Sequence, residues 1–502
     1  MAPIPRTNAD SDGNCWRGIP EIRRDFQSWL RSGLRLAVPL VIGTLVGSCS
    51  TLDSINHTLF GGGPTPGQQG YVKGFSGEVV ADEPRAALVG KEVLSGGGNA
   101  ADAAAAVGLA LAVTLPSRAG LGGGGACIAY APDSHTPAHG YPEAITFVSP
   151  PVRSVGGGDR PAAVPMLPRG LFFLHLRYGK LPFEFLLGKV DALARQGVPV
   201  STALARDLSL VAGPLFADPA ARAIFGFHDA PLAEGQTLIQ PQLAATLAQL
   251  GVSGVGDMYQ GVLARRIQQA SPSAGVPIGL ADLWSALPSL SSPVIVPLDD
   301  DQVAFPPTDG GVGAAAALVA LKSRPADPQA AFQRSLAAAA RWGAGGANLE
   351  QVLHGELAAP AAAPLYPAST TFATLDSDGN AVVCALTMNN LFGTGRMVPG
   401  LGFLAAASPA TVAPPLLAPG LAWSESRHAF HAEAGGSGQA GAALAAAVAL
   451  SNSVRSGYPM TNLVPDPGRA NVIACSRYLP GSDSSCAAAT DPREAGLATG
   501  GN

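Results

Sequence analysis

The chain has 502 residues, of which 47% are hydrophobic and 13% are charged, and its formal net charge is −5 at pH 7. A chain of this length can bury a large core and would form one large domain or two interlocked ones. The acidic balance and the lack of a Lys/Arg run argue against nucleic acid as a partner.

The N-terminal region predicts export. Arg31 and Arg35 precede the apolar run 36–46, which is too short to span a bilayer of about 30 Å as a helix and is typical of a signal-peptide core. The sequence V-G-S-C at 46–49 resembles a bacterial lipobox, with Cys49 as the lipidated residue. The alternative is an ordinary signal peptide cut near Ser48.

We therefore expect a signal peptide over residues 1–48 and a lipidated, flexible tether over 49–74, which is rich in Gly and Pro. Ser50 after the lipobox resembles lipoproteins that are sorted to an outer membrane. The expected location is the periplasm or the outer membrane of a Gram-negative bacterium, with membrane contact only through the lipid. R-R-D-F at 23–26 resembles a twin-arginine signal, which leaves the export route open between that pathway and general export.

Long apolar faces predict helices over 85–94 and 100–113, the second capped by Asn99, and further helices over 186–196 and 244–250. Four glycines at 122–125 precede an apolar run. Neither a Lys-Ser/Thr pair nor G-x-G-x-x-G spacing accompanies them, so they indicate backbone packed closely beside a strand rather than a phosphate loop.

An Ala/Pro-rich segment over 358–367 is expected to be irregular and exposed. The residues from Ser369 onward read S-T-T-F-A-T-L-D-S-D-G-N-A-V-V-C-A-L-T-M-N-N-L-F-G-T-G. Asp-Gly between two apolar runs is a strong hairpin signal. The hairpin would bring Thr387 back beside Ser369, since its two arms have similar lengths.

Cysteine and histidine usage suggests no cofactor. Cys475 and Cys486 flank a turn-rich loop and could form a disulfide in an oxidising compartment. Cys127 and Cys384 lie in apolar β-like runs and are interpreted as small buried hydrophobic residues. His428, His431 and Glu433 form the only imidazole cluster in the sequence, and we interpret them as ordinary solvated or core residues rather than metal ligands.

Three blocks in order resemble the gamma-glutamyltransferase family of self-cleaving N-terminal-nucleophile hydrolases. The first, over 96–130, contains G-G-G-N-A-A-D-A-A-A-A and the four glycines. The second is the segment that starts at Ser369, and the third is the pair Gly435-Gly436. The resemblance covers roughly residues 75–455, and F-G-T-G at 392–395 fixes its register.

The resemblance implies a precursor that cuts itself into a large subunit, 75–368, and a small subunit, 369–502, which remain associated. It assigns the nucleophile to Ser369, a second catalytic-site role to Thr387 and Asn389, and the oxyanion hole to Gly435 and Gly436. The chemistry is consistent with these residue types. A free Ser hydroxyl needs a base, and a new N-terminal amine can serve as one.

Thr370 and Thr371 are rival nucleophiles. Choosing either of them requires a deletion of one or two residues before the D-x-D-G-N turn, which the ungapped spacing to Thr387 does not need. Ser in place of the family's usual Thr keeps the hydroxyl but loses the methyl that stiffens χ1.

The sequence departs from the family where a glutamyl group would bind. The family's clamping Arg falls on Val148 and its Ser pair on Leu417 and Ala418. Thr411 lies near the position of an Asp that the family uses to bind the substrate amine. Arg118 and Arg396 are candidate substitute cations for the substrate carboxylate.

The family implies an α+β fold, a four-layer αββα sandwich. It also implies an autoprocessing amidohydrolase or acyltransferase that acts on a γ-glutamyl or related small-molecule amide or peptide, with glutathione as the typical donor. No metal or organic cofactor is expected. Two alternatives remain open: an inactive envelope binding or scaffold protein with the same fold, and an acylase with a non-glutamyl substrate.

Overall fold

The computed structural model describes residues 77–133, 140–153, 159–323, 327–356, 365–481 and 485–500. The expected signal peptide, the tether and the lipidation site at Cys49 lie outside these residues, as does most of the Ala/Pro-rich segment 358–367. None of the described helices has the length and hydropathy that a membrane span requires.

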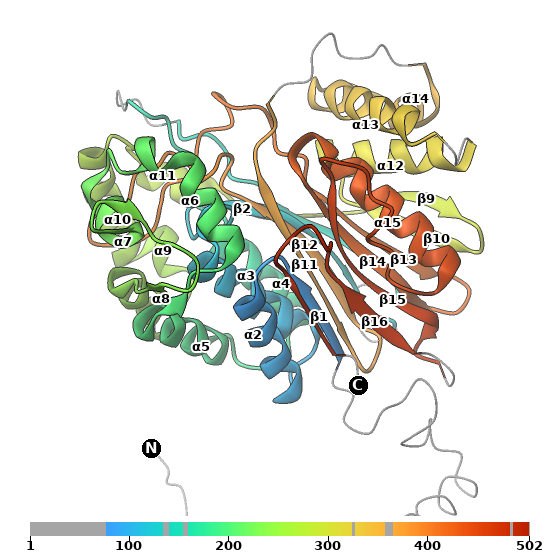
Figure 1. The fold of residues 1–502 in the computed structure, drawn as a ribbon, viewed down its shortest axis with the longest axis horizontal. Coiled ribbons are helices and arrows are strands. Elements are labelled where there is room, and N and C mark those ends of the chain that lie inside the picture. Colours follow the sequence, from blue (N-terminus) through green and yellow to red (C-terminus); the bar gives the residue numbers. More distant parts are fainter. Residues whose placement is uncertain are drawn as a thin grey trace, which may run out of the picture. The chain divides into compact units, whose positions relative to one another are not determined.

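Two antiparallel sheets are stacked face to face at the centre of the described chain (Figure 1). The seven strands of the first sheet are, in spatial order, β17 (Leu497–Thr499), β1 (Gly77–Ala81), β11 (Ser369–Asp376), β12 (Ala381–Thr387), β2 (Gly124–Tyr130), β3 (Glu143–Phe147) and β8 (Ser289–Ser291). The six strands of the second are β16 (Cys486–Ala489), β15 (Arg469–Leu479), β14 (Ala429–Ser437), β13 (Ala418–Ser424), β10 (Asp301–Phe305) and β9 (Val294–Leu298). Residues of both sheets, such as Val383 and Ile473, share one buried core between them.

Helices cover the outer face of each sheet (Figure 1). Those on the side of the first sheet are α2 (Pro84–Ser95), α3 (Ala100–Thr114), α4 (Leu167–Tyr178), α5 (Phe183–Gln196) and α8 (Pro241–Ser253). Those on the side of the second are α12 (Asp309–Ser323), α13 (Pro328–Gly343), α14 (Leu349–His354) and α15 (Ala442–Ser456). The expected αββα sandwich is confirmed.

The remaining elements are a helix of 14 residues and a set of shorter ones. They are α6 (Thr202–Leu215), α7 (Pro219–Phe225), α9 (Asp257–Gln260), α10 (Val262–Ala270), α11 (Leu280–Ser285), the 3₁₀ turn Ser271–Ala274 and the two-residue pairs β4 (Val198–Pro199) with β7 (Thr237–Leu238) and β5 (Gly226–Phe227) with β6 (Ala230–Pro231). A second 3₁₀ turn, Gln439–Gly441, leads into α15.

The predicted helices are present, and α3 shows why its sequence has no polar face. All of its residues are buried, because α3 packs between the first sheet and the helices outside it. Asn99 caps it: the Asn99 side chain accepts a hydrogen bond from the Asp102 N–H, and the Asp102 carboxylate accepts one from the Asn99 N–H. This reciprocal arrangement is a capping box.

The predicted hairpin is formed by β11 and β12, with Ser369 paired directly with Thr387. The Asp376 carboxylate closes the turn by accepting hydrogen bonds from the backbone N–H groups of Asp378 and Asn380. Gly379 has a φ of 85°, a left-handed conformation that Gly adopts without the strain of a Cβ. The local turn chemistry therefore sets the register that places the two hydroxyl residues side by side.

The cysteines require one correction. Cys475 and Cys486 form the expected disulfide. Cys127 and Cys384, interpreted above as small buried hydrophobic residues, are buried but also form a disulfide. They lie directly opposite each other on the neighbouring strands β2 and β12. The interpretation failed because an apolar strand pattern reveals burial but not which strand lies alongside.

Candidate active site

Alternate residues at the start of β11 face opposite sides of the first sheet, as strand geometry requires. The Thr371 hydroxyl faces the second sheet and donates a hydrogen bond to the Gly435 carbonyl oxygen, at 3.2 Å. The Thr370 hydroxyl faces the other way and donates to the Asp82 carboxylate, at 2.8 Å. Ser369 therefore shares the inner face with Thr371, in the layer between the two sheets.

Ser369 begins β11 beside a short chain of hydrogen bonds. The Thr387 hydroxyl donates to the carbonyl oxygen of Ala368, at 2.9 Å, and accepts from the backbone N–H of Asn389, at 3.0 Å. Ser369 is buried, with 4% of the residue's surface exposed. The Thr387 hydroxyl, which is oriented by the Asn389 N–H, thus polarises the carbonyl just before Ser369.

Asn389, the last residue in this series of hydrogen bonds, has a left-handed backbone conformation with a φ of 58°. Its side-chain amide group donates a hydrogen bond to the Ala407 carbonyl, at 3.0 Å, which fixes its orientation. Its side-chain oxygen is buried and has no hydrogen-bond partner among the described residues. A buried acceptor without a partner is costly, which indicates that a donor binds to this oxygen at a later stage.

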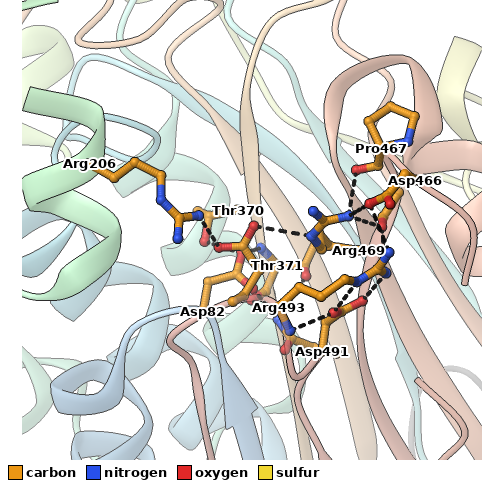
Figure 2. Close-up of polar contacts among 12 residues, drawn as sticks. Asp82, Arg206, Thr370, Thr371, Asp466, Pro467, Arg469, Asp491 and Arg493 are labelled. Atoms are coloured by element: carbon orange, nitrogen blue, oxygen red, sulfur yellow. Dashed lines mark hydrogen bonds and ion pairs between the residues drawn. The ribbon is translucent and has the colours of Figure 1, made fainter. Parts of the chain in front are cut away.

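Asp82, which follows β1, holds the start of β11 from the other side (Figure 2). One carboxylate oxygen accepts from the Thr370 hydroxyl and, at 3.0 Å, from the Thr371 N–H. The other accepts from the Asn471 side chain, at 2.6 Å, and the same Asn471 amide donates to the Thr371 carbonyl, at 2.9 Å. Neither Asp82 nor Asn471 was predicted, because no local pattern links Thr371 to residues that lie 289 and 100 positions away.

A network of ion pairs lies next to Asp82 in Figure 2. Asp466 bridges Arg469 and Arg493, at 2.8 and 2.9 Å, and Arg493 also pairs with Asp491, at 2.6 Å. Arg469 lies on β15 opposite Ser437 of β14. The network therefore ties the C-terminal segment to the end of the second sheet nearest Ser369.

Gly435 and Gly436 lie in β14, between β13 and β15. A Cβ on Gly435 would lie 2.5 Å from the Thr371 Cβ, and one on Gly436 would lie 2.1 Å from the Ala442 carbonyl oxygen. Each glycine is thus required by close packing, Gly435 on the inner face and Gly436 against α15. Gly435 is brought close to Thr371, two residues beyond Ser369 on β11.

The three positions at which the family carries its glutamyl clamp are apolar here, and two of them lie in the same cluster. Leu417 is fully buried against Ala126 and Ala385 of the first sheet, and Val148 packs against the same cluster. Ala418 belongs instead to the core on the helical side of the second sheet. Val148 and Leu417 therefore belong to one apolar cluster, and Ala418 lies outside it.

Val148 also lines a pocket of about 250 Å³ with the apolar residues Val164, Met166 and Leu287. Arg153 is part of its wall as well. Asp282 and Ser285 also line it, so the pocket combines apolar side chains with groups of both charges.

The other candidate substrate contacts have protein partners. Arg118 binds Asp207 with two hydrogen bonds, at 2.8 and 2.9 Å, and Arg396 pairs with Asp159, at 2.7 Å. The Thr411 hydroxyl donates to the Ser408 carbonyl, at 3.0 Å. None of these three side chains is joined to Ser369 or Thr387 by a hydrogen bond among the described residues.

The imidazole cluster is dispersed in the fold. His431 is hydrogen-bonded to Asp301, at 2.6 Å, and its ring packs on Tyr478. Within the described ranges, no group of three or more His, Cys, Asp or Glu is arranged to hold a metal ion. Glu433 is buried between the sheets, its carboxylate has no hydrogen-bond partner among the described residues, and burial raises its pKa well above the usual range.

Comparison with known proteins agrees with the sequence blocks. A family model described as gamma-glutamyltranspeptidase matches residues 86–344. The chain is 31% identical over 255 residues to the glutathione hydrolase proenzyme of Escherichia coli, an alignment that covers 48% of this chain and 44% of that protein. It is 28% identical over 382 residues to the glutathione hydrolase proenzyme of Pseudomonas aeruginosa, which covers 65% of this chain and 66% of that protein. The chain thus spans about half the length of the curated relatives it matches.

The fold is also similar to that of a cephalosporin acylase from Bacillus halodurans. The TM-score is 0.70 at 19% sequence identity, and the match covers 87% of this chain and 98% of that chain. At this identity the likeness concerns the fold alone. The match to the family model ends before Ser369 but extends over just over half of the chain. On these grounds, the chain belongs to the gamma-glutamyltranspeptidase family.

Proposed function

We propose that the protein is an autoprocessing amidohydrolase or acyltransferase of the gamma-glutamyltransferase type, with Ser369 as its nucleophile. The observation that carries the proposal is the Thr387 hydroxyl on the carbonyl oxygen of Ala368, the residue just before Ser369. A hydrogen-bond donor on that oxygen would stabilise the negative charge that develops when a nucleophile attacks the carbonyl carbon.

In the first reaction the Ser369 hydroxyl attacks the Ala368 carbonyl carbon. The peptide C–N bond breaks as the ester C–O bond forms, and the hydroxyl proton passes to the released nitrogen. Water then hydrolyses the ester, which leaves a carboxylate on Ala368 and a free amine on Ser369. The Ser369 side chain makes no hydrogen bond to any other described residue, which leaves its hydroxyl free for this attack.

In the second reaction the new amine acts as the base for the same hydroxyl. An α-amine has a pKa of about 7.7–8.0, so it can accept a proton near neutral pH. The unpartnered side-chain oxygen of Asn389 would accept a hydrogen bond from this amine. Gly435 and Gly436 would supply the oxyanion donors, and water or an amine would release the acyl group from Ser369.

The opposite orientation of Thr370 supports Ser369 as the nucleophile. The Thr370 hydroxyl donates to Asp82 on the helical side of the sheet, away from Thr387 and the Ala368 carbonyl. Cleavage before Thr370 would therefore require this bond to break and the strand to turn over.

A γ-glutamyl or related amide is the substrate class that the family and its relatives suggest, but the apolar cluster that includes Val148 and Leu417 favours a second candidate. A glutamyl head carries two charges, and burying them against apolar side chains costs several kcal/mol. We therefore propose, as an alternative substrate, an amide whose acyl group lacks a zwitterionic head. Hydrolysis rates on a panel of glutamyl and alkanoyl anilides distinguish the two substrates.

A clamp variant refines that comparison. Val148→Arg with Leu417→Ser and Ala418→Ser restores the polar residue types that the family carries. If the apolar character of these positions is what excludes a glutamyl head, this triple variant gains activity on a glutamyl anilide. Continued inactivity of a properly cleaved variant counts against this explanation. Arg118, Arg396 and Thr411 remain candidate contacts for the polar end of the substrate.

Self-cleavage is tested by measuring intact masses of the mature protein from cells that express the full chain. The wild type should give one chain that ends at Ala368 and one that begins at Ser369 after reduction. The Ser369→Ala variant should stay whole. A whole wild-type chain would favour the competing function, an inactive envelope binding or scaffold protein with this fold.

The location is proposed from the N-terminal sequence. We expect a mature protein in the periplasm or on the outer membrane of a Gram-negative bacterium, anchored through Cys49. Radiolabelled fatty acid should be incorporated into the wild type and not into Cys49→Ser.

A further inference from the structure

We infer that the two chains produced by self-cleavage remain covalently joined through the disulfide between Cys127 and Cys384. The inference rests on the proposed cleavage between Ala368 and Ser369. Cys127 lies on β2, before the cleavage point, and Cys384 lies on β12, after it. The bond therefore crosses from the large chain to the small chain.

The order of strands explains why the bond lies at this position. In the first sheet, β11 and β12 of the small chain lie between β1 and β2 of the large chain. The hairpin that carries Ser369 and Thr387 thus has the large chain on both sides. Cys127 faces Cys384 across the β2–β12 border, and their Cα atoms are 4.1 Å apart. Cys384 lies three residues before Thr387 on β12.

The bond is protected inside the fold. Both cysteines are fully buried, in the same core as Phe372 on the helical side of the sheet. Forming the bond removes two protons and two electrons from the two thiols. Thiol–disulfide exchange passes them to the disulfide of a separate oxidant molecule in the oxidising compartment. Export, which the N-terminal sequence predicts, supplies such a compartment.

The second disulfide provides a matched control. Cys475 and Cys486 both follow Ser369, so their bond closes a loop within the small chain and joins no two chains. Loss of either disulfide removes one cross-strand bond between neighbouring antiparallel strands. Only the loss of the Cys127–Cys384 bond should separate the subunits.

The test compares denaturing gels with and without reductant, using mature protein from full-length expression. Wild type should migrate as one joined species without reductant and as two chains with it. Cys127→Ser/Cys384→Ser should give two chains in both cases, whereas Cys475→Ser/Cys486→Ser should behave as wild type. Reductant added to folded protein, followed by alkylation before denaturation, should leave the bond intact because it is buried.

The outcomes separate this inference from the proposed function. Two separate chains in unreduced wild type would overturn the disulfide link and leave self-cleavage standing. A single chain after reduction would overturn self-cleavage and, with it, the link between two chains.

Peptide mass mapping of unreduced Ser369→Ala protein gives a second readout if the double-cysteine variant fails to fold. A linked peptide pair containing Cys127 and Cys384 is expected from this uncleaved protein. Free thiols at these two residues would overturn the inference whatever happens at Ser369.

Discussion

The Thr387 hydroxyl donates a hydrogen bond to the carbonyl oxygen of Ala368, at 2.9 Å. Because Ser369 pairs with Thr387 across the hairpin, the bond proposed for cleavage lies between a nucleophile and a donor that the same turn brings together. The arrangement makes the rate of self-cleavage the most direct readout of this site.

Replacing Thr387 by Val removes the hydroxyl and keeps the side-chain shape. Loss of one such donor typically costs about 2.7–4 kcal/mol in the transition state, so self-cleavage should slow by roughly 10²–10³-fold. A time course of the fragments on reducing gels measures the rate. Thr387→Ser, which keeps the hydroxyl, should cleave at a rate much closer to wild type. Equal rates for wild type and Thr387→Val would exclude this role.

Replacing Thr370 by Val should leave the cleavage position unchanged and lower stability. The Thr370 hydroxyl donates to the Asp82 carboxylate, and hydrogen bonds to charged groups contribute about 1.5–3 kcal/mol. Chemical denaturation measures the loss, and sequencing of the new N-terminus locates the cut. An uncleaved Thr370→Val protein that remains folded would transfer the nucleophile role to Thr370.

Replacing Glu78 by Gln should stabilise the protein increasingly as pH rises. Glu78 is 1% exposed, and burial raises the pKa of its carboxyl from 4.5 to about 8, an effect that Lys91 partly offsets. Between these two pH values the folded state binds more protons than the unfolded state, so the free energy of unfolding falls as pH rises.

The gain of Glu78→Gln over wild type should therefore grow from about pH 4.5 and level off above about pH 8. Since one pKa unit corresponds to about 1.4 kcal/mol, a gain of a few kcal/mol is expected at most. Thermal unfolding across this pH range measures it, with the exposed Glu184→Gln as control. A gain that does not change with pH would contradict the assignment.

Replacing Gly435 by Ala should disrupt the site and the fold around it. The new Cβ would lie 2.5 Å from the Thr371 Cβ, so β11 and β14 would have to move apart. Overpacking of this kind typically costs about 1–3 kcal/mol, and the shift of β11 should also slow self-cleavage. Gly188→Ala, in α5 with open space around the added methyl, is the control and should be neutral or slightly stabilising.

Local features of this protein were determined by the sequence alone. The Asn99 cap, the helix it begins and the turn at Asp376 depend on neighbours a few residues away, and each is present as predicted. The pairing of Ser369 with Thr387 belongs to this class, because the Asp-Gly turn sets the register of a hairpin without help from the rest of the chain.

Only the tertiary structure decided which distant segments meet. Cys127 and Cys384 are separated by 257 positions, and nothing in either apolar run shows that β2 lies beside β12. The same holds for the hydrogen bond between Thr370 and Asp82 and for the apolar cluster that includes Val148 and Leu417. Strand order and sheet stacking follow from burying all apolar faces at once, so contacts between distant segments depend on the whole chain and cannot be derived from any one motif.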